Sequence, residues 1–99
     1  MKPRNYYVYI ITNPDKTVLY TGMTNDIGKR LNEHYENRGK QNTFAGKYHC
    51  YNLLYYDRFQ FAQHAIAREK EIKDWNRKKK EALIALENPD WRILNDEID

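Results

Sequence analysis

Long apolar runs, cysteine, glycine and proline are all scarce in this sequence of 99 residues. The longest apolar runs cover a few residues, whereas a helix needs roughly 20 to cross a bilayer, so no segment is expected to span a membrane. The single cysteine, Cys50, cannot form an internal disulfide, and this predicts a protein of a reducing, cytoplasmic compartment. With 4 glycines and 3 prolines, the chain has neither linkers nor low-complexity segments.

Several common catalytic signatures are also missing. The sequence contains no glycine-rich phosphate-binding loop, no nucleophile elbow and no dinucleotide-binding fingerprint. His49 and Cys50 are adjacent, but they lack a companion pair at zinc-ligand spacing, which argues against a zinc site.

The composition is that of one folded domain over residues 1–99. Hydrophobic residues make up 40% and aromatic residues 14%, including 9 tyrosines, which is too apolar for a disordered chain. The formal charge is +3, from 17 basic and 14 acidic residues. The basic residues are concentrated in residues 70–80, where six lie within eleven positions: Lys70, Lys73, Arg77, Lys78, Lys79 and Lys80.

Three segments have the pattern of β-strands. Tyr6–Thr12 and Thr17–Thr21 are rich in β-branched and aromatic residues, and Asn13–Lys16 between them has the proline and aspartate of a turn. We therefore expect a hairpin with a four-residue loop, whose second strand ends at Gly22. A third strand is predicted over Tyr51–Asp57.

Three further segments have helical periodicity. The first helix is predicted from a cap within residues 24–26 to about Arg38, the second over Phe61–Trp75 and the third over Arg77–Glu87, which Asn88-Pro89 ends. The apolar residues expected to face the core are, helix by helix, Ile27, Leu31 and Tyr35; Ala62, Ala65, Ile66 and Ile72; and Ala82, Leu83 and Leu86.

The order of these elements predicts an α+β fold. Residues 40–50 are polar and aperiodic, and we expect a loop or a short helical turn there. The order β-β-α-β-α-α favours a small domain with a three-stranded, mainly antiparallel sheet flanked by helices. The tail with Trp91, Ile93 and Leu94 is expected to pack back onto this body.

Glu69 lies where packing alone would not place a carboxylate. It is three or four residues from Ala65, Ile66 and Ile72, in the centre of an apolar stripe. Carboxylates are rarely buried without a partner, because their desolvation is costly. One interpretation is that Glu69 pairs with Lys73, four residues further on. The other is that Glu69 is held at a cleft to bind a cation.

Arg30 and His34 are four residues apart and share a helix face. An arginine can donate two parallel hydrogen bonds to a phosphate, and a histidine titrates near neutral pH. The other interpretation is that both are solvated edge residues near Glu33 and Asp26.

Tyrosines on the first two strands are a third candidate group. Tyr7 and Tyr9 share one face of the first strand, and Tyr20 lies on its partner. Such residues usually form cross-strand packing, but a buried hydroxyl needs a hydrogen-bond partner. Because a phenol has a pKa of about 10, it can act as a base at neutral pH only beside a positive charge.

In chain order, these residues resemble the GIY-YIG nuclease domain. Tyr7-Val8-Tyr9 stands in the place of the first triplet of that family and Tyr20-Thr21-Gly22 in the place of the second. Arg30 matches the family's arginine, His34 a position that holds histidine or tyrosine, and Glu69 the lone metal-binding glutamate. The ordered set of polar positions carries the resemblance, since each triplet alone would be weak.

The resemblance covers about residues 4–80 and leaves 81–99 as a C-terminal helix and tail. Arg68–Trp75 and Asn88–Trp91 look like the small stand-alone bacterial members. Three substitutions within the triplets fall on strand or packing positions. Met23, however, stands where repair-type members have a lysine near the reacting phosphate.

The resemblance implies hydrolysis of nucleic-acid phosphodiester bonds with one Mg²⁺ or Mn²⁺ ion. Glu69 would bind the ion, Arg30 the phosphate oxygens, and Tyr9 or Tyr20 would orient or deprotonate the attacking water, with His34 as hydrogen-bond partner or base. DNA is the expected nucleic acid. The residues expected to bind it are Lys73, Lys78, Lys79, Lys80 and Asn88.

Two other functions fit the same residues. The chain could be a nucleic-acid-binding module without turnover that uses its tyrosines for stacking. It could also be a catalytic subunit that is silent until a partner protein supplies affinity for the substrate.

Overall fold

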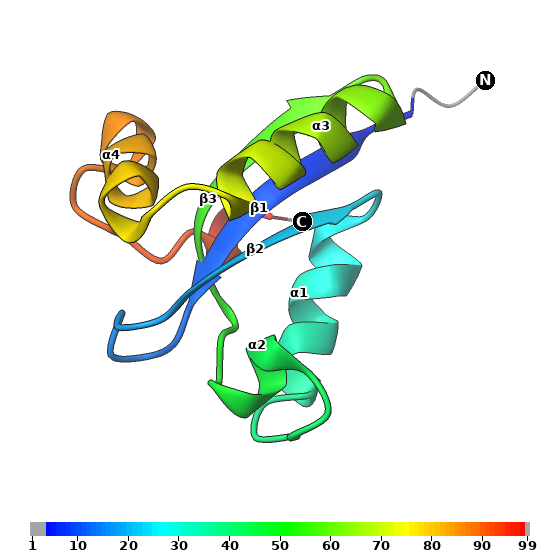
Figure 1. Ribbon diagram of the computed structural model, residues 1–99. Coiled ribbons are helices and arrows are strands. Elements are labelled where there is room, and N and C mark those ends of the chain that lie inside the picture. The colour runs from blue at the N-terminus through cyan, green and yellow to red at the C-terminus, as the bar shows by residue number, and fades with distance from the viewer. Residues whose placement is uncertain (1–3, 99) are drawn as a thin grey trace.

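The computed structural model describes residues 4–98 (Figure 1). The elements are β1 (Tyr6–Thr12), β2 (Leu19–Thr24), α1 (Ile27–Glu36), α2 (Phe44–Lys47), β3 (Asn52–Phe59), α3 (Ala62–Lys73), α4 (Arg77–Glu87) and a short 3₁₀ helix (Asn95–Glu97). The predicted order of strands and helices is confirmed, and the segment 40–50 contains the short helical turn α2. None of the helices within residues 4–98 is long and apolar enough to cross a membrane.

The three strands form one antiparallel sheet in the order β2-β1-β3, so the predicted α+β architecture is confirmed. In Figure 1, α3 and α4 lie on one side of the sheet, while α1 and α2 lie on the other. The central strand β1 is therefore covered on both faces, and its residues from Val8 to Thr12 are all buried. The strand β2 forms an edge, with α3 and α1 on either side of it.

Alternate side chains of β1 pack into two separate hydrophobic cores, because successive side chains of a strand point to opposite faces of the sheet. Tyr9 and Ile11 pack with α1 and α2 and with Leu94 of the tail. Val8 and Ile10 pack with α3 and α4 on the opposite face.

The second strand begins and ends later than its sequence pattern predicts. Thr17 and Val18 do not pair in the sheet, because their N–H groups donate to the side-chain oxygen of Asn13, each at 2.9 Å. Gly22 does not end the strand either. It pairs with Tyr9 in the middle of the β1–β2 ladder, and β2 continues to Thr24.

Gly22 is required because the phenol ring of Tyr9 lies directly against its backbone. A Cβ atom at position 22 would lie 2.4 Å from both Cζ and the hydroxyl oxygen of Tyr9, well inside contact distance. Tyr9 is itself fully buried. The glycine of the second triplet thus creates the space that the tyrosine of the first triplet fills.

The ends of α1 differ in how they are fixed. Asp26, one of the three candidate caps, accepts a hydrogen bond from the N–H of Lys29 at 3.1 Å. At the other end, Tyr35 was predicted to face the core, yet half of it is exposed. Its ring lies at the surface between the guanidinium of Arg38, 3.8 Å from the ring centre, and the ring of Tyr51.

The buried faces of the last two helices are narrower than predicted. On α3, Ala65 and Ile72 are buried, but Ile66 is exposed. On α4, Ala82 and Leu86 are exposed, and Ile84 is buried in their place. The rotation of α4 is fixed at its first residue, because Arg77 donates hydrogen bonds to the carbonyl oxygens of Lys16 and Thr17. The tail packs back as expected, with Leu94 buried, although Ile93 is exposed.

Asn88 has a structural role that its sequence position did not indicate. It is buried, and its amide nitrogen donates to the carbonyl oxygens of Leu54, at 3.1 Å, and Arg92, at 2.8 Å. Its carbonyl oxygen accepts from the N–H of Arg92 at 3.0 Å. Both amide hydrogens are used inside the fold, so the contacts of Asn88 in this structure support a structural role and not nucleic-acid binding. Asn88 ties the end of α4 to β3.

Replacement of Gly22 by alanine tests the contact with Tyr9. We expect Gly22→Ala to lower the free energy of unfolding by about 1–3 kcal/mol, since overpacking forces neighbouring groups to shift. Urea denaturation followed by circular dichroism measures it. Gly28→Ala, within the first turn of α1, is the control and should be neutral or stabilising by up to about 1 kcal/mol. Equal destabilisation by the two variants would contradict the account.

Replacement of Asn88 by alanine tests its structural role. We expect Asn88→Ala to destabilise the protein by about 1–3 kcal/mol, because buried carbonyl and N–H groups lose their partners. Asn32→Ala, on the exposed surface of α1, should leave the free energy of unfolding within about 0.5 kcal/mol of the parent. An Asn88→Ala protein as stable as the parent would refute the role.

Candidate active site

The centre of the candidate site is a hydrogen bond between β1 and α1. The hydroxyl oxygen of Tyr9 lies 2.8 Å from Nε2 of His34. Their rings meet edge to face, with centres 5.7 Å apart. Helix α1 packs across this face of the sheet through Ile27 and Leu31, and this packing brings His34 over the strand.

Tyr20 extends the site to the edge strand β2. Its ring lies 5.7 Å from the ring of His34 and stacks at 6.0 Å on Phe44 of α2. From the other side of the sheet, Nζ of Lys73 on α3 comes within 5.8 Å of the Tyr20 ring centre. Tyr20 therefore contacts side chains from both layers of helices at one sheet edge.

Arg30 is both a partly solvated residue beside Glu33 and a neighbour of the buried Tyr9. Its side chain is partly exposed and lies 3.3 Å from the carboxylate of Glu33, so the predicted surface pair is present. Its positive charge also acts on Tyr9, where it lowers the pKa of the phenol against larger opposing effects. The guanidinium thus faces both solvent and the buried tyrosine.

Glu69 also combines its two interpretations. The pair with Lys73 is confirmed, with Nζ of Lys73 3.5 Å from a carboxylate oxygen. The Glu69 side chain is only 21% exposed, and its charge contributes to raising the pKa of Tyr9. The structure thus brings the carboxylate to the same sheet edge as the tyrosines, although it comes from the opposite helical layer.

The site holds two titratable groups in their neutral forms. Burial is the main cause that raises the pKa of Tyr9 far above its ordinary value of 10, and the nearby phenol of Tyr20 adds to this effect. Burial, followed by the charge of Arg30, lowers the pKa of His34 below its ordinary value of 6.5. At neutral pH the Tyr9–His34 hydrogen bond therefore joins a protonated phenol to an uncharged imidazole.

The donor set at this edge fits a magnesium-like ion better than zinc. Within residues 4–98, no three His, Cys, Asp or Glu side chains come together as a ligand group. Zinc prefers four protein ligands, or three in a catalytic site. Mg²⁺ instead retains several waters and binds one or two carboxylates together with substrate phosphates, which a single half-buried glutamate such as Glu69 satisfies.

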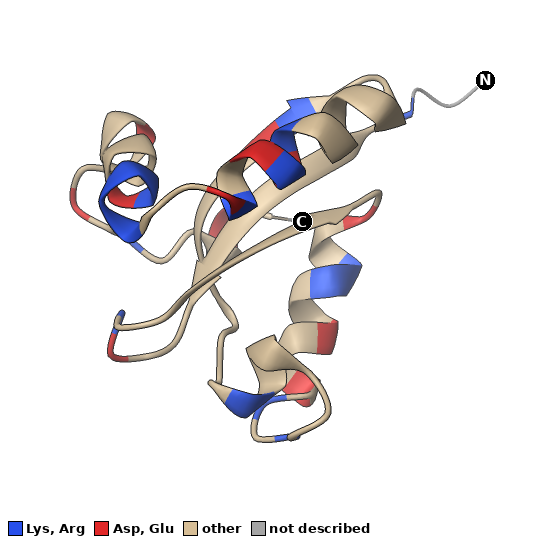
Figure 2. Cartoon of the chain, viewed as in Figure 1, with Lys and Arg blue, Asp and Glu red and all other residues tan. Residues whose placement is uncertain are grey.

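The basic residues of the sequence fall into separate positions. Lys73 belongs to the site through Glu69 and Tyr20. Lys78 and Lys79 are exposed on the first turn of α4, which Figure 2 shows in blue, while Lys80 is half-buried. Nζ of Lys79 lies 4.6 Å from the ring centre of Trp75. Lys78, Lys79 and Lys80 thus lie on a different helix from Arg30 and His34 on α1 and from Glu69 on α3.

Sequence reasoning missed the contribution of α2. Phe44 stacks on Tyr20, and a cavity of about 280 Å³ lies between them and α1. Its lining consists of Tyr20, Arg30, Glu33, His34, Asn37, Thr43 and Ala45. Tyr9 is fully buried beneath His34 and does not line it. The signal that could have revealed α2 is the pair of aromatic residues Phe44 and Tyr48, spaced four apart in an otherwise polar segment.

Comparisons with known proteins match most of this chain. The family model of the GIY-YIG catalytic domain matches residues 5–82. A UPF0213 protein of Bacillus pumilus is 36% identical over 84 residues, covering 85% of this chain and 83% of the relative. A UPF0213 protein of Natronomonas pharaonis is 39% identical over 81 residues, covering 82% and 92%.

A solved structure shows the same architecture. The solution NMR structure of a UPF0213 protein from Bacillus halodurans is 32% identical, with a TM-score of 0.56, and the match covers 88% of this chain and 89% of that one. The family indicates nuclease chemistry, a divalent metal and nucleic acid as the partner. The matched family model, together with the small relatives, shows that this chain belongs to the GIY-YIG catalytic domain family.

Proposed function

We propose that this chain is a divalent-metal-dependent endonuclease that hydrolyses phosphodiester bonds of nucleic acid, DNA in the first place. One observation carries the proposal: side chains from four different elements meet at the β2 edge of the sheet. These side chains are Tyr9, Tyr20, Arg30, His34 and Glu69. One sheet edge thus holds the two charged groups that phosphodiester hydrolysis needs: the guanidinium of Arg30 for the phosphate and the carboxylate of Glu69 for a metal ion.

Glu69 is the residue that would hold the metal, Mg²⁺ or Mn²⁺. The bound ion would supply a Lewis acid that stabilises the leaving oxygen. Without an ion, the carboxylate is neutralised by Lys73 at 3.5 Å. If Glu69 held a cation, the ammonium of Lys73 would be free to contact a phosphate oxygen. This lysine lies beside Tyr20 and supplies a positive charge that Met23, in the place of the family's lysine, cannot.

Arg30 is suited to hold the scissile phosphate. It lines the cavity and is partly exposed, so a phosphate can reach its guanidinium. Preorganised donors that face the oxygens where charge increases stabilise a transition state strongly. Glu33 keeps the side chain of Arg30 in this orientation through their contact at 3.3 Å.

Tyr9 is a positioning residue in this mechanism. It is fully buried and its pKa is raised, so it neither contacts the substrate nor takes a proton from water. Its hydroxyl fixes the ring of His34 at 2.8 Å. His34 and Tyr20 line the cavity, and they are the two groups that can orient or deprotonate the attacking water. The lowered pKa of His34 keeps its imidazole in the neutral state that a base needs.

Replacement of the metal-binding carboxylate tests the proposed activity. We expect Glu69→Gln to slow cleavage of labelled DNA oligonucleotides in Mg²⁺ or Mn²⁺ by about 10²-fold or more, because it removes the anionic ligand while keeping the shape of the side chain. Chelation of the metal should abolish cleavage by the parent. Glu71→Gln, on the same helix but exposed, is the matched control and should cut at the parental rate.

The outcomes of this assay separate the other functions. Equal cleavage by Glu69→Gln and the parent would refute the metal role of Glu69. Metal-independent DNA binding without any cleavage would favour a binding module. A parent protein that binds the metal at Glu69 but cuts no DNA would favour a subunit that needs a partner.

The neutral state of His34 predicts a pH-dependent stability. Because the pKa of His34 is lower in the folded chain than in the unfolded chain, the unfolded state binds more protons as the pH falls below neutral. The contribution of the neutral His34 to stability is therefore fully present above pH 6.5. It is lost as the pH falls through the pKa of His34 in the folded chain. We expect His34→Gln to weaken the decrease in Tm between pH 7.5 and pH 5, measured by circular dichroism.

His64→Gln provides the control for this pH series, since His64 is exposed on α3. It should retain the parental dependence of Tm on pH. An identical pH dependence in His34→Gln and the parent would contradict the neutral state of the half-buried His34.

A further inference from the structure

Two aromatic side chains are exposed next to the site, Phe44 at the start of α2 and Tyr48 at its C-cap. Phe44 is 51% exposed and Tyr48 is 40% exposed. They are four residues apart, so they lie on the same face of the short helix, and their ring centres are 4.7 Å apart. Phe44 also stacks on Tyr20 at an interplanar angle of 25°. Three rings therefore form a continuous row that leads outward from the site.

The segment that carries these rings is firmly anchored. Ala45 and Gly46 are buried, and the N–H of Gly46 donates to the hydroxyl of Thr43 at 3.0 Å. The carbonyl of Gly46 accepts from the N–H of Gly39 at 2.8 Å. A Cβ atom at Gly46 would lie only 2.5 Å from the carbonyl oxygen of Lys40. The exposure of Phe44 and Tyr48 is thus a feature of a closely packed turn, whose rings are held in place for a ligand.

The segment that carries the rings is basic. Residues 37–48 contain three basic residues, Arg38, Lys40 and Lys47, and no acidic residue. Nζ of Lys47 lies 5.4 Å from the ring centre of Tyr48. Figure 2 shows these basic positions in blue on α2 and on the loop before it. A row of aromatic rings with cations beside it is complementary to bases with their phosphates.

The row is continuous with the cavity that holds the phosphate-binding arginine. Tyr20 stacks on Phe44 and lines this cavity of about 280 Å³ together with Arg30 and Thr43, the residue before Phe44. A strand whose phosphate contacts Arg30 therefore has its neighbouring nucleotides directly beside α2.

We propose that Phe44 and Tyr48 form a base-stacking subsite for unpaired bases next to the phosphodiester bond that is cut. This inference rests on the proposed function and adds the substrate class: a single strand, or a strand that is locally unpaired. Bases within a duplex already stack on their neighbours, so only an unpaired base offers its face to Phe44 and Tyr48. The rings and the cations do not read base edges, so stacking here tolerates every sequence.

The first test compares two oligonucleotides of equal charge. The parent protein, with the metal chelated to prevent cleavage, is titrated with a fluorescent single-stranded DNA of about 12 nucleotides, within the usual size of such sites. The second oligonucleotide has the same length and phosphates but abasic residues throughout. Because one stacked base contributes about 1 kcal/mol or more, the base-bearing strand should bind at least about fivefold more tightly at the same salt concentration.

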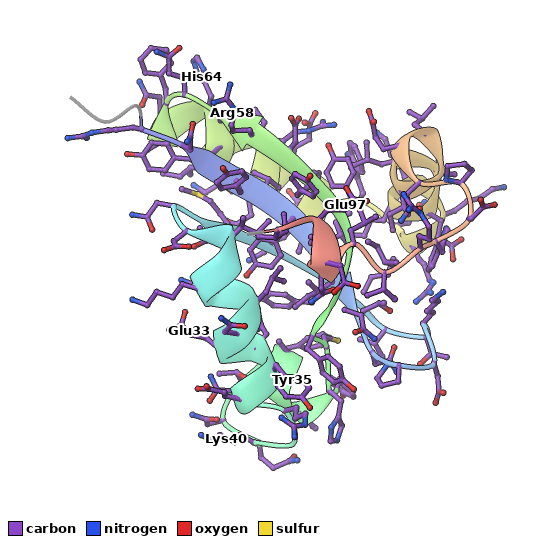
Figure 3. The ribbon with its side chains drawn as sticks, turned by 180° about the vertical axis from the view of Figure 1, so that it is seen from behind. Glu33, Tyr35, Lys40, Arg58, His64 and Glu97 are labelled. Atoms are coloured by element: carbon purple, nitrogen blue, oxygen red, sulfur yellow. The ribbon has the colours of Figure 1, made fainter. Side chains whose placement is uncertain are left out.

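Two variants then locate the effect. Phe44→Leu and Tyr48→Leu should each reduce the preference for the base-bearing strand and leave the affinity for the abasic strand unchanged. Phe61→Leu is the matched control, because Phe61 is 50% exposed and its ring contacts His64. Figure 3 shows His64 at the opposite end of the molecule from Lys40, so this variant should keep the parental preference.

Each outcome decides between the claims. Equal affinity for the base-bearing and abasic strands would overturn the stacking subsite and leave the nuclease proposal intact, and it would favour a protein partner on α2 instead. Absence of binding to either strand at low salt would overturn both proposals. If Phe44→Leu lowers Tm enough to unfold the chain, the comparison of the two strands with the parent protein alone decides.

Discussion

The contact of the Tyr9 ring with the backbone of Gly22 is the constraint on which the site depends. Tyr9 occupies the middle of the central strand, and its cross-strand partner must be a glycine because a Cβ atom would lie 2.4 Å from the phenol. Held in this way, the hydroxyl reaches His34 at 2.8 Å and aligns α1 over the sheet. The two sequence triplets are therefore two halves of one packing unit, and the unit determines where His34 and Arg30 face solvent.

Much of the fold could be predicted because local patterns agree with the tertiary structure. The strand and helix order, the antiparallel sheet and the bounds of α4 follow from alternation, periodicity and the proline after Asn88. Contacts between distant segments could not be predicted. Gly22 has the local signature of a strand end, whereas a ring on another strand requires it, so the predicted end of β2 is wrong. The structural role of Asn88 depends on β3, 34 residues away, and no local pattern indicates it.

In the candidate site, too, local patterns could be predicted and contacts between distant segments could not. Glu69 was recognisable because a carboxylate within an apolar stripe conflicts with packing, and the structure resolves this conflict by placing it at the sheet edge with Lys73. The spacing of Phe44 and Tyr48 marks an aromatic turn, but the stacking of Phe44 on Tyr20 and the cavity beside Tyr20 join distant segments and could not be predicted from it. The edge strand β2 connects these parts: α3 supplies the carboxylate from one side, while α1 and α2 supply the cation and the aromatic surface from the other.

Paramagnetic broadening by Mn²⁺ tests the metal site most directly, because it requires no knowledge of the substrate. Amide resonances of the isotope-labelled protein are recorded by NMR during titration with Mn²⁺, for the parent and for Glu69→Gln. The account predicts broadening centred on Glu69, Lys73, Tyr20 and Tyr9 in the parent and its loss in the variant. Diffuse broadening that Glu69→Gln leaves unchanged would contradict a metal site at this sheet edge.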